Sequence, residues 1–244
     1  SAQQKNLELK KKERVDLAVR GRGSRSELMY FNVWRQLAAT MQVGDMEHYH
    51  RPGSPQAPRM YPGFPNVLFA GEQHEAFREL PPKQVTWLLA RQLTTARPEL
   101  APVRALLPEE VGAAIEGAIR LWVRDGSGID LGLDGRVVEN WSRALNVALG
   151  ERAKMALKQP VTTCVQKGEL RGLAKYLEGT EHTASRAALL MTNDIRVADR
   201  ALGDPDGLVD MSYRRRAREL MLFSLSDDYF ALRQQFGLSL ARKT

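Results

Sequence analysis

Three histidines in the first third of the chain are the side chains best suited to hold a metal ion. His48 and His50 alternate on a predicted strand, so both imidazoles face the same side. With Glu47 or His74 nearby, the pair could bind a metal. The alternative is a solvent-facing strand without metal, because such pairs often lack further ligands. His74 also begins a near match to the zinc motif H-E-x-x-H, but the match lies in a predicted turn and has arginine in place of the second histidine.

A second candidate site lies on a helix predicted from about Pro82 to Ala96. In H-E-x-x-H, two histidines one turn apart face the metal and the glutamate acts as general base. The same places on this helix read Arg91, Gln92 and Thr95. A guanidinium is a permanent cation, an amide cannot take up a proton, and a threonine hydroxyl is a poor zinc ligand. We therefore expect no catalytic residue, metal or cofactor there if this frame applies.

A later segment completes the frame. Glu181-His182-Thr183-Ala184-Ser185 matches the pattern E-x-x-A-D except for the final serine, and strand-like segments at 47–51 and 66–71 precede the first helix. With these motifs, residues 28 to 240 resemble gluzincin metallopeptidases of the heat-shock-protease and prenyl-protease type. Residues 180–194 and 223–233 also resemble domains at the C-terminal end of helical-repeat proteins of myxobacteria, so a repeat array could precede this chain.

The resemblance implies a vestigial site. Gluzincins take their third metal ligand from the glutamate of the second motif, which is Glu181 here. Arg91, Gln92 and Thr95 are then expected to converge with Glu181 between two helices, with Arg91 in the vacated metal position and paired with Glu181. In the alternative, Arg91 simply faces solvent.

The composition is typical of an ordinary globular chain. With 244 residues and 43% hydrophobic content, the chain can bury a substantial core. We expect a basic N-terminal arm or exposed helix at 1–23 and a single mainly helical domain at 24–244. The sequence has neither a signal peptide nor an apolar run of about 20 residues, which favours a cytoplasmic protein without a transmembrane segment. The lone cysteine, Cys164, excludes an internal disulfide and is expected to be a buried structural thiol.

The net charge of +7 raises the possibility of an anionic partner. Basic clusters include Lys10, Lys11 and Lys12, and Arg214, Arg215 and Arg216. These side chains could contact nucleic acid or an anionic lipid surface. The alternative is that they are solvated helix faces and a flexible arm, since no aromatic residues interleave with them as a stacking platform requires.

Helical periodicity dominates the chain, and we predict a mainly α (α+β) fold. Near residues 45–71, proline-rich sequence and strand-like segments predict a short β-hairpin or small sheet. Asn193-Asp194 and Ser226-Asp227-Asp228 are expected to kink or re-cap the last two helices. The helices are predicted at about 24–43, 82–96, 108–122, 135–158, 161–177, 180–202 and 210–235.

Three functions remain open. The first is a non-catalytic, metallopeptidase-like scaffold that presents its old substrate groove or outer surface to a protein partner. The second is a metal-dependent hydrolase with a cryptic site built from His48, His50, His74 and Glu181. The third is an electrostatic binder of nucleic acid or a membrane surface.

Overall fold

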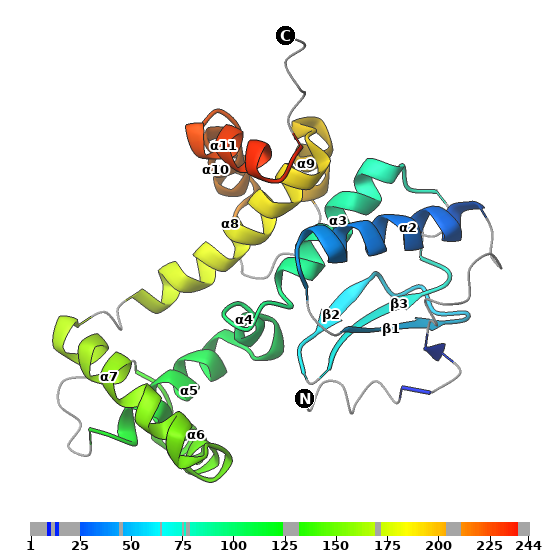
Figure 1. Ribbon diagram of the computed structural model, residues 1–244. Coiled ribbons are helices and arrows are strands. Elements are labelled where there is room, and N and C mark those ends of the chain that lie inside the picture. Colours follow the sequence, from blue (N-terminus) through cyan, green and yellow to red (C-terminus); the bar gives the residue numbers. More distant parts are fainter. Residues whose placement is uncertain are drawn as a thin grey trace. The chain divides into compact units, whose positions relative to one another are not determined.

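The computed structural model describes residues 9–10, 13–14, 25–43, 46–63, 65–74, 76, 79–123, 132–168, 172–203 and 211–238 (Figure 1). The fold is mainly helical with one small three-stranded sheet, as the sequence predicted. None of the helices in the described ranges has the length and apolarity needed to cross a bilayer.

The elements follow one another in this order: α2 (Arg25–Thr40), β1 (Met46–Arg51), β2 (Arg59–Tyr61), β3 (Asn66–Gly71), α3 (Pro82–Thr94), α4 (Ala101–Ala105), α5 (Pro108–Arg120), α6 (Gly135–Ala148), α7 (Glu151–Lys167), α8 (Leu173–Thr192), α9 (Ile195–Leu202), α10 (Tyr213–Ser224) and α11 (Asp227–Gln235).

The chain divides into two compact units. Unit 1 consists of Ser1–Ala105 and Gly179–Thr244, and unit 2 consists of Leu106–Glu178. The division therefore falls inside the stretch 24–244 that was predicted as a single domain. The predicted boundary after residue 23 lies outside the described residues.

The sheet of unit 1 is mixed, with β3 between the two other strands. β1 pairs with β3 in parallel and β2 pairs with β3 in antiparallel orientation. Because successive side chains alternate between faces, Leu68 and Ala70 of β3 join the main core, whereas Val67 and Phe69 belong to a smaller cluster. The proline-rich segment before β3 contributes the short strand β2, so the small sheet predicted near residues 45–71 is present.

Helix α3 lies at the centre of the main core. It begins at Pro82, and proline suits the first turn because its missing N–H would have no helical partner there. Val85, Trp87, Leu89 and Leu93 are all buried in the main core. The predicted core helix is therefore present, and it ends close to the expected position.

Several helix boundaries differ from the predicted ones. The helix predicted at 135–158 is split at Leu149 and Gly150, and α7 continues through Pro160, where a new helix was expected. A proline inside a helix removes one backbone hydrogen bond. Helix α7 nevertheless continues on both sides of Pro160. The short helix α4 was not predicted. By contrast, Asn193, at a positive φ of 49°, and the capping residue Asp194 separate α8 from α9 as expected.

Unit 2 contains a tight crossing of α5 and α6. A side chain at Gly117 would collide with the backbone of Ser142, since an added Cβ would lie 2.8 Å from the Ser142 nitrogen. Cys164 lies on α7 and is only half-buried, so the prediction of a buried thiol is wrong in its degree of burial.

Candidate functional site

A buried ion pair joins α3 to α8 in unit 1. Arg91 Nη2 donates to both carboxylate oxygens of Glu181, at 2.8 Å to Oε1 and 3.1 Å to Oε2. Glu181 is 0% exposed and Arg91 only 9%. The pairing expected from the sequence is therefore present, and the alternative of a solvent-facing Arg91 is wrong.

Small residues follow Glu181 on α8. Ala184 and Ala188 are fully buried, and Ser185 lies one turn after Glu181. Arg91 Nη1 donates to Ser185 Oγ at 3.4 Å, and Ser185 Oγ lies 3.5 Å from Glu181 Oε1. The serine thus borders both charged groups through long, weak hydrogen bonds.

A second arginine borders the same carboxylate. Arg216 Nη1 of α10 lies 3.9 Å from Glu181 Oε1, and the arginine is 9% exposed. From the sequence, Arg216 was expected to contact an external anion together with Arg214 and Arg215. Arg214 and Arg215 are exposed, but Arg216 faces inward to an internal carboxylate, so that expectation is wrong for Arg216.

The other basic cluster is only partly described. Lys10 is exposed, and its backbone N–H donates to Glu13 Oε2 at 3.4 Å. Lys11 and Lys12 lie outside the described residues.

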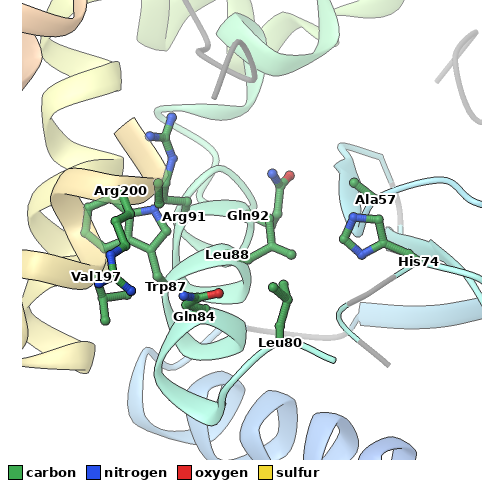
Figure 2. A pocket seen from close by; sticks show the side chains of 11 residues that line it. Ala57, His74, Leu80, Gln84, Trp87, Leu88, Arg91, Gln92, Val197 and Arg200 are labelled. Carbon is green, nitrogen blue, oxygen red and sulfur yellow. The ribbon is translucent and has the colours of Figure 1, made fainter. Parts of the chain in front are cut away.

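Gln92 and Thr95 have partners of their own. Gln92 Oε1 accepts from the backbone N–H of Met60 on β2 at 3.0 Å and from Arg104 Nη2 at 2.8 Å. Thr95 Oγ1 donates to the backbone carbonyl of Gln92 at 2.7 Å. The side chains of Arg91 and Gln92 leave α3 in different directions (Figure 2). The expected convergence on Glu181 thus holds for Arg91, whereas Gln92 satisfies an edge strand and Thr95 its own helix.

A cavity of about 400 Å³ lies along α3, also within unit 1. Trp87, Leu88 and Arg91 contribute from α3, with residues of α9 on one side and His74 and Ala57 on the other (Figure 2). Gly71, at the end of β3, allows the segment before β2 to pass close by, because any Cβ there would collide with the Ser54 backbone.

The cavity lining combines apolar and cationic side chains. Val197 and Ala201 of α9 extend the apolar wall, and Arg200 lies between them along the sequence. Among the described residues that line the cavity, none is acidic. A site of this kind can accept an apolar group that carries negative charge.

His48 is a core residue. It is 2% exposed and lies against the rings of Tyr30, Phe31 and Trp34 of α2. Burial, and secondarily the nearby His50, lowers the pKa of His48 from 6.5 to about 3. His50 also contacts Phe31, so both histidines face α2 and lie on the same side of the strand, as alternation predicted. The expected solvent-facing strand is wrong for His48.

The described residues offer no group for a metal ion. No three side chains of His, Cys, Asp or Glu in these ranges come together as ligands. The cryptic site proposed from His48, His50, His74 and Glu181 is therefore not assembled. His74 lines the cavity, and its Nδ1 accepts from the backbone N–H of Ala76 at 3.1 Å.

Three arginines near this site were not singled out correctly from the sequence. Arg104 and Arg200 carry no motif, and Arg216 was grouped with its exposed neighbours. Their places depend on how α4, α9 and α10 pack in the folded chain. Only the spacing of buried positions along α10 could have separated Arg216 from Arg214 and Arg215. Comparisons of the chain with protein-family models, with curated proteins and with solved structures found no match.

Proposed function

We propose that this protein is a non-catalytic scaffold of metallopeptidase-like design that binds a protein partner in the cavity along α3. The single observation that carries the proposal is the buried ion pair between Arg91 and Glu181, at 2.8 and 3.1 Å. These are the residues that the gluzincin resemblance assigns to the first and third metal ligands.

The chemistry of the pair supports the absence of metal catalysis. The Arg91 guanidinium cannot be deprotonated in a protein and repels a divalent cation at this position. It also occupies both oxygens of the carboxylate that would serve as a ligand. Gln92 stands where a general base is required, and its amide is instead held by Met60 and Arg104.

The ion pair also offers a structural substitute for a metal. A metal ion and an ion pair can each link side chains of two helices across a buried space. Here the two carboxylate oxygens of Glu181 accept hydrogen bonds from Nη2 of Arg91. A buried pair adds little net stability, because desolvation of the charges offsets their attraction. Its role is to hold α3 and α8 in register.

The first prediction is that a zinc site can be recovered by substitution. Arg91→His, Gln92→Glu and Thr95→His together place two imidazoles one helical turn apart, the first of them at the position that contacts Glu181. We expect the triple variant to bind zinc much more tightly than the natural chain. Adding Arg216→Gln should strengthen binding further, because a cation 3.9 Å from Glu181 opposes the metal charge.

Zinc titration calorimetry and metal analysis of the purified proteins measure these affinities. The matched control is the triple variant with Glu181→Gln, which should lose the gain because the third ligand is gone. One tightly bound zinc or manganese ion per natural chain would refute the non-catalytic proposal. Equal affinity in the triple variant and its Glu181→Gln control would refute the assignment of Glu181.

A further inference from the structure

The charge around the ion pair is unbalanced. Arg91 and Arg216 share Glu181 as their carboxylate, and Arg216 Nε is buried without a hydrogen-bond partner in the described part of the chain. Two guanidinium groups beside one carboxylate leave a net positive charge in a region of low dielectric constant. Such a region attracts an anion more strongly than the same charge would in water.

Arg200 adds a cation at the exposed side of the cavity. It is exposed on α9, and within the described ranges its guanidinium has no ion-pair partner. Two acidic residues of the described part of α9 and its N-cap have other partners. Asp199 accepts a hydrogen bond from the Tyr213 hydroxyl, and Asp194 pairs with Lys83 at 2.8 Å. Arg200 is thus available to a ligand.

The rest of the cavity is suited to an apolar chain. Leu80, Trp87, Leu88, Val197 and Ala201 line it, and its volume of about 400 Å³ is within the usual range of small-ligand sites. A free phosphate would leave these apolar walls without a partner. An internal apolar peptide segment would leave Arg200 without one. A group with an apolar body and a negatively charged end can contact the apolar walls and also pair with the arginine.

We infer that the cavity binds the C-terminal end of a partner polypeptide, with apolar last residues against Trp87 and Leu88 and the terminal carboxylate contacted by Arg200 and Arg91. This inference rests on the proposed function, since it names the part of the protein partner that the scaffold recognises. A terminal carboxylate is planar and matches the paired N–H groups of a guanidinium, which favours arginine over lysine at such a site.

A fluorescein-labelled peptide, Gly-Ser-Gly-Ser-Leu-Leu with a free C-terminus, is the probe, and fluorescence anisotropy gives its Kd. We expect saturable binding to the natural chain. The same peptide with an amidated C-terminus should bind about tenfold more weakly or worse, because it loses a charged hydrogen bond. A peptide that ends in Gly-Gly should also bind more weakly, because it lacks the apolar side chains.

Variants of α9 test the assignment of residues. Arg200→Gln should weaken binding about tenfold, and Arg200→Lys should recover only part of it, because lysine keeps the charge but not the planar geometry. Ala201→Trp should abolish binding by filling the cavity. Arg218→Gln is the matched control, because it removes one exposed arginine outside the cavity and should leave Kd unchanged. Circular dichroism establishes that each variant is folded.

Equal binding of the free and amidated peptides, or full binding to Ala201→Trp, would overturn the inference. Absence of binding by every peptide would overturn it too, and octanoate binding in that case would identify the ligand as a free carboxylate instead of a polypeptide end. These outcomes are separate from the zinc titration. A natural chain without metal whose triple variant gains zinc would keep the proposed function even if the peptides fail.

Discussion

At the scale of single residues, Glu181 is expected to matter more for stability than its partner Arg91. Glu181→Gln leaves two buried guanidinium groups without a carboxylate, which should cost about 3–5 kcal/mol. Arg91→Met should cost less, because Arg216 remains 3.9 Å from Glu181 and can still pair with it. Urea unfolding of both variants measures the free energies.

The control for these variants is Glu99→Gln, which removes one carboxylate from an exposed ion pair with Arg97. Exposed pairs contribute about 1 kcal/mol or less, so this variant should unfold almost like the natural chain. A loss for Glu181→Gln no larger than that of Glu99→Gln would contradict the buried pairing.

His48 is expected to make the fold sensitive to acid. Its pKa is about 3 in the folded chain and about 6.5 when unfolded, so the unfolded state takes up a proton first as pH falls. The free energy of unfolding should therefore decrease between these values, by about 1.4 kcal/mol per pH unit at most. Between pH 7 and pH 5, the natural chain should lose about 2 kcal/mol more than His48→Phe.

Urea unfolding at the two pH values tests this, with His182→Gln as a control that removes a half-buried imidazole from α8. That control should follow the pH dependence of the natural chain. If His48→Phe does so as well, His48 is not the acid-sensitive group.

At the scale of elements, α3 is expected to be the helix on which unit 1 depends most. Leu89→Ala should reduce the free energy of unfolding by about 2–5 kcal/mol, because Leu89 is fully buried and deletion leaves a cavity. Leu88→Ala is the matched comparison, one residue away on the half-buried side that lines the existing cavity. If the two variants have the same thermal unfolding temperature, α3 is not the helix on which unit 1 depends most.

The sequence predicted the elements better than their contacts. The apolar positions of α3 and the Asn193-Asp194 break after α8 are local signals, and both are present. The Arg91–Glu181 pair was predicted through a resemblance that ordered the two motifs along the chain. The direction of the Gln92 side chain was not predicted, because it depends on its hydrogen bonds with Met60 and Arg104. Met60 is remote in sequence, and Arg104 carries no motif. Arg216 shows the same limit, since its neighbours are identical in type but exposed.

At the scale of the whole molecule, the division into two units is also a property of long-range packing. Helices α5, α6 and α7 have the same kind of periodicity as those of unit 1, and no change in composition marks Leu106 or Glu178. The chain leaves unit 1 after Ala105 and returns to it at Gly179. Unit 1 is therefore assembled from two separate stretches of the chain.

This arrangement has a consequence for synthesis of the protein. Arg91 and Glu181 are 90 residues apart, so Arg91 is made long before the carboxylate that it pairs with. At about 5–20 residues per second, a ribosome needs several seconds to add the intervening segment. During that interval α3 can pack on α2 and β2, which are made before it, but α8 and α9 are missing and Arg91 lacks its carboxylate. The nascent chain should consequently present α3 to chaperones until residue 181 and the helices after it emerge.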